Sequence, residues 1–205
     1  LTMVAVDGFR LALRKEPILE KNGNFEFVVP GASLSEVEKI CRETDDPVDV
    51  HQGARHVLFK MGDTILIARR LEGEFLAWRQ AIPRNNPIKV TVETKQLLSC
   101  IERVSLIVSE KLKSPLRCVM GEGEIHITTR TAIGNAQDRC PMEGSGNGLE
   151  IGFNNRYMME ALKAASREKV TLELSSPITP CIIVPADGED NFLFMVLPVR
   201  LKADL

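Results

Sequence analysis

Hydrophobic and polar positions alternate along most of the chain in a way that predicts short strands, interrupted by three helices. The apolar side chains of the helices recur at helical spacing: Leu34, Val37, Ile40 and Cys41 in the first, Leu97, Leu98, Ile101, Val104 and Val108 in the second, and Met158, Ala161 and Leu162 in the third. The predicted strands are residues 25–30, 48–50, 56–61, 64–70, 88–92, 116–120, 124–128, a long run from there toward Arg139, and residues 149–153, 170–174, 181–184 and 192–197.

Turn and capping residues separate these elements. Residues 3–13 alternate about Asp7-Gly8, which predicts two short strands or one bulged strand, with Gly8 supplying a permissive backbone. Ser33 and Glu36 form a capping-box pattern ahead of the first helix. Caps are also predicted at Thr94, before a helix that extends to about Glu110, and at Asn154 or Asn155, and turns at residues 62–63, 121–123 and 186–188.

The order of elements predicts an α+β fold built from repeated strand–helix–strand–strand–strand units, without residue identity between them. One helix on one sheet leaves apolar helix surface uncovered, so we expect two units to pair into a domain with two helices packed on antiparallel sheets. Residues 84–205 form one such complete domain in this interpretation, and residues 1–83 form a domain whose first half is missing. We therefore expect the natural protein to continue upstream of Leu1.

The most apolar stretch of the chain is residues 191–201. It predicts a strand covered on both faces, which ends at Pro198 because proline cannot donate a ladder hydrogen bond. The following residues, 198–201, would then lie on the surface with apolar side chains and unpaired backbone groups. That combination favours the docking of a partner peptide over the closing of a core.

Composition excludes several classes of protein. Of the 205 residues, 44% are hydrophobic and 26% charged, and the net charge is −2. These values are ordinary for a globular protein and argue against one that binds nucleic acid with its whole surface. The sequence shows no apolar run long enough to span a membrane. The five scattered cysteines predict reduced thiols of a cytoplasmic protein, and the three histidines show no metal-ligand spacing, so no metal or cofactor is expected.

Four stretches of the chain match the signatures of one known family, in the right order. Residues 5–12 (AVDGFRLA) are similar to the signature Thr-Asp-Gly-His-Arg-Leu-Ala, and residues 71–83 to the segment Gly-x-Phe-Pro-x-Tyr-x-x-x-Ile-Pro. Residues 151–154 match Ile-Gly-Phe-Asn, and residues 197–201 match the ending Met-Pro-Val-Arg-Leu, with Leu197 in place of methionine. The chain therefore resembles the family of the bacterial DNA polymerase III beta subunit, the beta sliding clamps. The resemblance covers essentially the whole chain and implies part of the middle domain followed by the third domain.

The resemblance implies a DNA-clamp fold and a protein without catalytic residues. Members of the family are head-to-tail homodimers that form a ring around duplex DNA, with helices lining the hole. They act as processivity factors that tether the polymerase III catalytic subunit, and they also bind the clamp loader, through short peptide motifs. A chain with half of the interface missing is expected not to close a ring by itself.

The family's peptide-binding pocket carries over to specific positions of this chain. Three of them depart from the usual pattern: Phe9 replaces a histidine, Leu76 a proline and Gln80 a common basic residue. These departures imply a more apolar and less charged pocket. The pocket residues are Val6, Gly8, Phe9, Arg10, Leu11, Leu76, Gln80, Ala81, Pro180, Met195, Val196, Leu197, Pro198, Val199, Arg200 and Leu201.

Two further surfaces follow from the resemblance. The predicted DNA-facing residues are Lys95, Arg103, Arg156, Lys163 and Arg167, which would touch phosphates without reading bases. From sequence alone, a solvated helix face balanced by Glu102, Glu160 and Glu168 fits equally well. Leu106 and Ile107 match the subunit interface, and they lie off the inward face of their helix, although spacing alone fits ordinary core packing equally well.

Two other functions compete with this interpretation. A thiol enzyme would need a nucleophile and a base such as Cys41 with His51, which nothing in the sequence positions, and rapid labelling of one thiol by iodoacetamide would favour it. Asp7 could act as the catalytic carboxylate of a hydrolase, although an Asp-Gly pair between strands is far more often a turn. A peptide-binding scaffold without DNA would share the pocket, and salt-dependent retention of circular DNA by the full-length protein would distinguish it.

Overall fold

The computed structural model describes residues 1–42, 45–109 and 114–201, which form two compact units. The larger unit contains Leu1–Pro17 and Arg79–Leu205, and the smaller unit contains Ile18–Trp78. The first residues of the chain therefore pack with its C-terminal part, and the smaller unit is an insertion between them. The division of the chain into domains at residue 83 stays a prediction.

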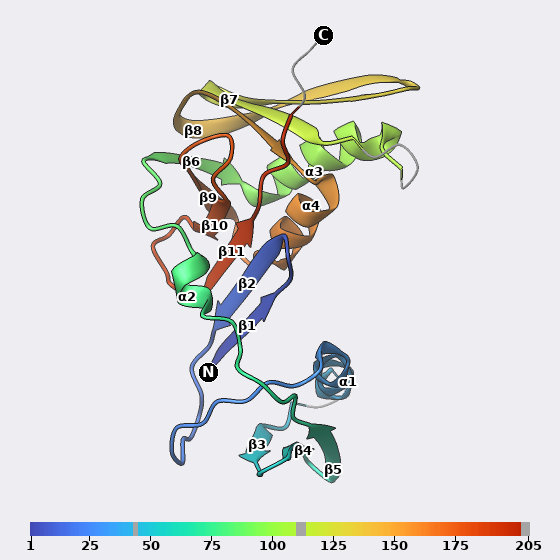
Figure 1. The fold of residues 1–205 in the computed structure, drawn as a ribbon, viewed down its shortest axis with the longest axis vertical. Helices are drawn as coiled ribbons and strands as arrows, with labels where there is room; N and C mark the ends of the chain where they lie inside the picture. Colours follow the sequence, from blue (N-terminus) through green and yellow to red (C-terminus); the bar gives the residue numbers. More distant parts are fainter. Residues whose placement is uncertain (43–44, 110–113, 202–205) are drawn as a thin grey trace. The chain divides into compact units, whose positions relative to one another are not determined.

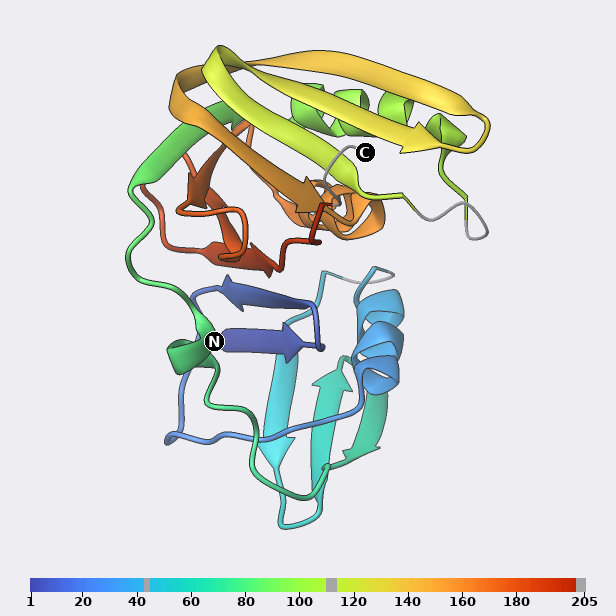
Figure 2. The same ribbon diagram turned by 45° about the horizontal axis from the view of Figure 1, so that its top comes forward.

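The larger unit is built on an antiparallel sheet of eight strands in the order β1-β2-β11-β10-β9-β6-β8-β7 (Figure 1). Its strands β7 and β8 form a long hairpin that bends across the unit (Figure 2). The strands are β1 (Thr2–Val6), β2 (Arg10–Lys15), β6 (Ile88–Glu93), β7 (Leu116–Thr131), β8 (Gly134–Phe153), β9 (Lys169–Leu174), β10 (Cys181–Pro185) and β11 (Phe192–Val196).

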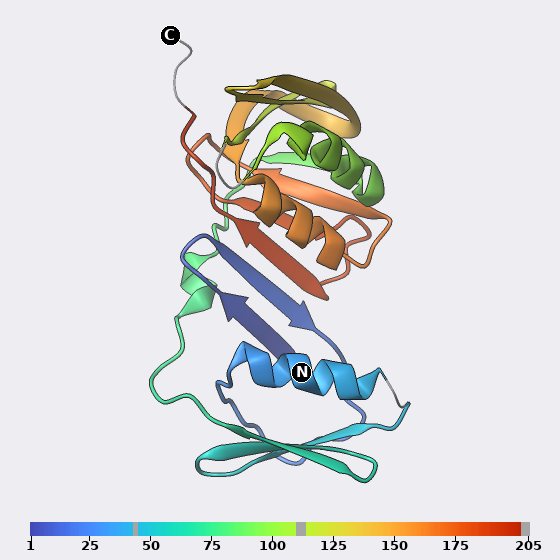
Figure 3. The ribbon, with the colours of Figure 1, turned by 90° about the vertical axis from the view of Figure 1, so that its right-hand side faces the viewer.

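Two longer helices, α3 and α4, pack against the strands of the larger unit. Helix α3 (Thr94–Val104), extended by the 3₁₀ turn η1 (Ser105–Ile107), packs against β7 and β8, and α4 (Asn155–Ala164) packs against α3 and β11. Figure 3 shows the two helices side by side, with the β7–β8 hairpin on one side of them. Their apolar faces meet a continuous core whose fully buried side chains include Leu97, Ile101, Phe153, Leu162 and Phe192. This arrangement confirms the predicted α+β fold with two helices on antiparallel strands.

The smaller unit has a three-stranded antiparallel sheet, β3 (Val48–Gln52), β4 (His56–Met61) and β5 (Thr64–Arg69), in the order β3-β4-β5. Helix α1 (Gly31–Cys41) packs on it through Leu34, Val37 and Ile40, against a small core of Val57, Phe59, Met61 and Ala68. The short helix α2 (Trp78–Ala81) begins at the last residue of this unit.

Two predictions in the first helical unit are wrong. Residues 25–30 form no strand, although Phe27 and Val29 still pack against the small core. Ser33 does not cap α1: the helix begins at Gly31, and Pro30 occupies the capping position with no side-chain hydrogen bond. The alternating pattern of residues 25–30 thus reflects packing of an irregular segment on one face.

The predicted turn at residues 121–123 is also wrong. The backbone continues through these residues as β7, and the register with β8 shifts between Met120 and Glu122 and again between Glu122 and Glu124. The glycines therefore allow a bulge that bends a long strand. The predicted cap at Thr94 is wrong, because helix α3 starts at that residue and Glu93 occupies the capping position. The predicted extension toward Glu110, which itself lies outside the described residues, is wrong as well: the α-helix ends at Val104, the 3₁₀ turn ends at Ile107, and residues 108 and 109 are not helical.

The predicted cap of the third helix is confirmed at Asn154. Its Oδ1 accepts hydrogen bonds from the backbone N–H groups of Arg156 at 2.9 Å and Tyr157 at 3.3 Å. Across the described parts of the chain, no helix is both long and apolar enough to cross a membrane. The same residues contain no group of acidic, histidine and cysteine side chains arranged to hold a metal ion.

Candidate peptide-docking site

Pairing of β2 with β11 brings together the two predicted walls of the pocket, which lie at opposite ends of the sequence. Leu11 is opposite Met195, and Arg10 is opposite Val196. Beyond the strands, the backbone N–H of Leu197 donates to the carbonyl oxygen of Phe9 at 2.9 Å. Residues 8–11, where the β1–β2 loop enters β2, and the end of β11 are therefore direct neighbours.

Asp7 shapes the loop between β1 and β2. Its Oδ1 accepts hydrogen bonds from the backbone N–H groups of Phe9 at 2.8 Å and Arg10 at 3.0 Å, which is the geometry of an Asx turn. Its Oδ2 accepts from Nε of Arg10 at 3.0 Å. Gly8 does not adopt a positive φ, and a Cβ there would have no atom within 4 Å. Asp7, and not the permissive backbone expected at Gly8, therefore defines this turn.

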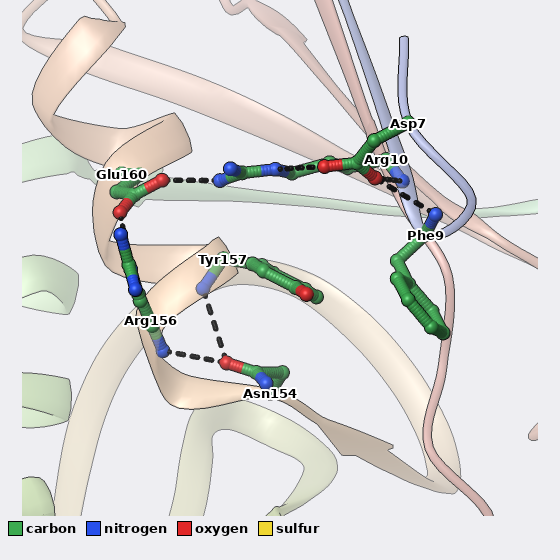
Figure 4. A network of polar contacts seen from close by, with 7 residues as sticks. All are labelled: Asp7, Phe9, Arg10, Asn154, Arg156, Tyr157 and Glu160. Carbon is green, nitrogen blue, oxygen red and sulfur yellow. Dashed lines mark hydrogen bonds and ion pairs between the residues drawn. The ribbon is translucent and has the colours of Figure 1, made fainter. Parts of the chain in front are cut away.

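An aromatic pair lies at the site, with an exposed Phe9 and a half-buried Tyr157. The Phe9 side chain is 59% exposed, and its ring stacks on that of Tyr157 with centroids 6.0 Å apart. The guanidinium carbon of Arg10 lies 4.5 Å from the Tyr157 ring centroid, within cation–π distance. Figure 4 shows these side chains converging from the β1–β2 loop and from α4.

Tyr157 is not among the pocket residues predicted from the sequence. The signal available was its position: it is the only tyrosine of the chain and follows directly on Ile-Gly-Phe-Asn at the start of a helix. A tyrosine has both an apolar body and a polar tip, which is why this residue type is enriched at interfaces.

Two carboxylates hold the guanidinium of Arg10 in place. Glu160 on α4 accepts a hydrogen bond from Nη1 of Arg10, and its other oxygen accepts from Nε of Arg156 at 2.7 Å (Figure 4). The pKa of Glu160 lies below its usual value because Arg10, and then Arg156, hydrogen-bond to the ionised form. Burial acts to raise the pKa of Asp7, but the hydrogen bonds from Phe9 and Arg10 together outweigh burial and lower this pKa.

The C-terminal segment is docked on β8. The backbone N–H of Val199 donates to the carbonyl oxygen of Gly152 at 2.8 Å, so the expectation of unpaired backbone groups in residues 198–201 is wrong at this position. A Cβ on Gly152 would lie 2.4 Å from the carbonyl oxygen of Val199 and 2.7 Å from Cδ2 of Leu201. The glycine of Ile-Gly-Phe-Asn is thus required by the close approach of this segment.

The remaining predicted pocket residues are distributed over both units. Val6 ends β1, and Pro180 precedes Cys181, which is opposite Val196, so Pro180 lies at the end of the sheet where the chain leaves β11. Gln80 and Ala81 are exposed residues of α2. Leu76 belongs to the smaller unit and is 54% exposed. The roles of all these residues stay predictions, as do those of Pro198 and Arg200.

Four of the five predicted DNA-facing residues form ion pairs. Arg103 pairs with Asp138 at 2.7 Å, Arg156 with Glu160 at 2.7 Å, Lys163 with Glu102 at 2.9 Å, and Arg167 with Asp187 at 2.9 Å. Lys95 is exposed in the first turn of α3. Two of the balancing carboxylates are the ones expected for a solvated helix face, Glu102 and Glu160. A role in contacting DNA stays a prediction.

Leu106 and Ile107 lie in the 3₁₀ turn after α3. Leu106 is 83% exposed, so ordinary core packing does not account for it in this chain. Ile107 is half-buried. Their place in a subunit interface stays a prediction.

The cysteines lack the properties of a nucleophile. Cys100, Cys118, Cys140 and Cys181 are buried. Burial raises the pKa of Cys118 and of Cys140 to about 12 and also raises that of Cys181, so these thiols stay protonated near neutral pH. Cys41, the partner considered for His51, directs its Sγ at Sδ of Met61, 3.6 Å away. This geometry disfavours a thiol enzyme.

The two lowered carboxylate pKa values predict a loss of stability in acid. Because Asp7 and Glu160 ionise more readily in the folded state, their contribution is complete above their unfolded values of 3.8 and 4.5 and is lost as the pH falls through the folded values. The side chains are 46% and 42% exposed, so each contributes less than about 1 kcal/mol. We expect the urea midpoint to fall between about pH 5 and about pH 3, and to fall less in a variant carrying Asp7→Asn and Glu160→Gln. Equal pH dependence of both proteins would contradict this assignment.

Comparison with known proteins agrees with the geometry of the site. The profile described as DNA polymerase III beta subunit, central domain, matches residues 1–76, and that of its C-terminal domain matches residues 79–200. The Beta sliding clamp of Staphylococcus aureus is 30% identical over 202 residues, which cover 98% of this chain and 53% of that protein. That of Staphylococcus epidermidis is 31% identical over the same length. The chain thus spans about half the length of the curated relatives it matches.

Solved structures show the same relationship. A DNA polymerase sliding clamp from Pseudomonas aeruginosa has a TM-score of 0.89 and 26% identity, covering 97% of this chain and 54% of that one. The DNA polymerase III beta subunit of Thermotoga maritima has a TM-score of 0.88 and 28% identity, covering 98% of this chain and 55% of that one. The chain therefore belongs to the DNA polymerase III beta subunit family, the beta sliding clamps, which are non-enzymatic proteins of DNA replication with the DNA-clamp fold.

Proposed function

We propose that the protein acts in the cytoplasm as a DNA polymerase processivity factor, part of a ring that encircles duplex DNA and recruits partners through a peptide pocket. The observation that carries the proposal is the meeting of the Gly8–Leu11 loop with the end of β11, beside the exposed Phe9 ring and the docked C-terminal segment. Its partners are the polymerase III catalytic subunit and the clamp loader, which present short linear motifs.

The surface of the site suits a peptide with apolar anchors. Phe9 and Val199 expose apolar side chains next to fixed backbone, at 59% and 38% exposure. Burial of two anchors, a leucine and a phenylalanine, contributes roughly 1.5–3 kcal/mol each, and each added backbone hydrogen bond about 1 kcal/mol. Ordering the peptide opposes binding. Micromolar affinity, about −8 kcal/mol, is the scale expected for such a site, and it suits partners that exchange.

The DNA-facing surface is proposed on α3 and α4. These helices lie side by side, and Lys163 of α4 pairs with Glu102 of α3 across their junction. Because most of the basic side chains already have carboxylate partners, phosphates would compete with them, and the contact would be weak and sensitive to salt. A ring that slides requires this kind of non-specific contact. The exposed Leu106, with Ile107, is proposed to lie at the subunit interface of the homodimer.

A peptide titration tests the proposal. A fluorescent peptide of the Gln-Leu-x-Leu-Phe type is expected to bind the chain with saturable, micromolar affinity measured by anisotropy. The same peptide with alanine at the leucine and phenylalanine anchors is the control and is expected not to bind. Failure of the first peptide to bind would reject the pocket in this chain.

A variant then locates the binding site. Deletion of Leu201 combined with Arg200→Ala removes side chains from the C-terminal wall, while the core of the unit is untouched. We expect this variant to lose peptide binding and to keep its circular dichroism spectrum and melting temperature. Retained binding would place the peptide elsewhere.

A further inference from the structure

One carboxylate links the peptide-docking site to the exposed side of α4. Glu160 lies 150 positions from Arg10 in the sequence, outside both walls of the pocket. Its Oε2 accepts from Nη1 of Arg10, and its Oε1 accepts from Nε of Arg156 at 2.7 Å (Figure 4). Two arginines from different elements therefore share one side chain.

Arg10 is the more constrained of these arginines. Its Nε donates to Oδ2 of Asp7 at 3.0 Å, and its guanidinium lies over the Tyr157 ring. With Glu160 it has three partners in three directions, which together leave one orientation. Its side chain is 33% exposed, whereas that of Arg156 is 73% exposed. Arg156 is thus the partner that can leave Glu160 at little cost.

The position of Arg10 determines the local shape of the pocket. Arg10 is the first residue of β2 and is opposite Val196, and the preceding Phe9 accepts the hydrogen bond from the N–H of Leu197. Both Phe9 and Arg10 contact the Tyr157 ring. Any movement of the Arg10 side chain toward solvent would remove a contact that holds the loop against α4.

We propose that Glu160 is a positioning residue of the peptide pocket, which orients Arg10 against Tyr157 through Oε2 while its Oε1 binds Arg156. The inference rests on the proposed function, because it concerns the affinity for a partner peptide. The proposal predicts different effects of two substitutions on the peptide affinity: removing the Glu160 carboxylate weakens binding, and removing the Arg156 charge does not. Removing Glu160 loosens Arg10, whereas removing Arg156 leaves the carboxylate to Arg10 alone.

The test compares three charge-removing variants of the 205-residue chain by peptide anisotropy. Glu160→Gln is expected to weaken binding about threefold to tenfold. Arg156→Gln is expected to bind as tightly as the unaltered chain, or up to about threefold more tightly. Glu102→Gln is the matched control, since Glu102 is a similarly exposed helix carboxylate whose partner is Lys163, and it is expected to have no effect.

A merely structural role for Glu160 gives a different result. If the carboxylate only stabilised α4 through its pair with Arg156, the Glu160→Gln and Arg156→Gln variants would lose affinity equally, and the proposal would be overturned. Unchanged binding by Glu160→Gln would overturn it as well. In a double-mutant cycle, Arg10→Gln with Glu160→Gln is expected to bind no worse than Arg10→Gln alone, and additive losses would contradict the coupling.

A second measurement does not depend on the peptide. The Nε–H signal of Arg10 in ¹⁵N NMR spectra is expected to be sharp and slow to exchange in the unaltered chain and in Arg156→Gln, and to broaden in Glu160→Gln. If the unaltered chain binds no peptide, the proposed function fails, and the Arg10 signal alone then decides whether Glu160 positions this side chain. An Arg10 signal that is identical in all variants would overturn the positioning role.

Discussion

Gly152→Ala is expected to reduce affinity for the partner peptide by about tenfold or more while leaving the fold intact. The added methyl group would lie 2.4 Å from the carbonyl oxygen of Val199, a distance that real Cβ contacts essentially never show. Gly152 is near the end of β8, flanked by the buried Ile151 and Phe153, so this strand cannot easily move. The C-terminal segment must leave instead.

The size of the effect follows from what the segment loses. The hydrogen bond from Val199 to Gly152 contributes about 1 kcal/mol, and the packing of Leu201 on the glycine adds to it. Without these contacts the peptide would have to order the segment as it binds, which costs affinity. The measurements are peptide anisotropy and hydrogen exchange at the Val199 amide.

The control for this prediction is a glycine in the other unit. Gly31→Ala places a methyl group where no atom lies within 4 Å, and its backbone needs no positive φ. It is expected to bind peptide like the unaltered chain. If Gly152→Ala also binds normally while the Val199 amide stays protected, the segment does not depend on the glycine as the geometry indicates.

Gly146→Ala is expected to have the largest effect on stability, a loss of about 3 kcal/mol or more in the free energy of unfolding. A Cβ at this position would lie 2.0 Å from Cβ and 2.6 Å from the carbonyl oxygen of Met120. Met120 is buried and belongs to the neighbouring strand, at the point where the β7–β8 register shifts. Relief of the clash would require both strands to separate at the bulge.

Gly148→Ala separates this clash from backbone strain. Gly148 lies two residues along β8, has a positive φ of 69°, and has no atom within 4 Å of its Cβ position. Its replacement is expected to cost only about 1–2 kcal/mol, because an L-residue is disfavoured in that conformation. Urea unfolding followed by circular dichroism measures both variants. Equal losses would show that conformational strain, and not the contact with Met120, is what matters at Gly146.

The spacing of apolar residues within a segment predicted the elements that such spacing defines by itself. The helical spacing of Leu97, Ile101 and Val104 placed α3 correctly, because one face of that helix meets the core. The same reasoning divided β7 in two, since glycines at 121 and 123 are typical of turns as well as bulges. The two cases differ only in whether a partner strand continues alongside, and the sequence near the glycines does not contain that information.

The residues of the candidate site could be predicted from the sequence only in part, because some of their contacts are also long-range. The walls were located through their resemblance to a family, and Asp7 was correctly assigned to a turn. Tyr157 and Glu160 were missed as pocket residues because their contacts to Phe9 and Arg10 join segments far apart in the sequence, 150 positions in the case of Arg10 and Glu160. The spacing of residues within a short segment cannot predict such contacts. The ion pairs of Arg103 and Arg167 depend in the same way on Asp138 and Asp187, which lie on other elements.

The strand order β1-β2-β11-β10 joins the first two strands of the chain to its last one. The β1–β2 hairpin is connected to the rest of the eight-stranded sheet through β11, which pairs with β2 on one side and with β10 on the other. Pairings between segments so distant in sequence form slowly, because closing the long intervening loop costs conformational entropy. The candidate docking site therefore exists only when β2 and β11 are paired, and a chain in which these two strands are separated is expected not to bind the peptide.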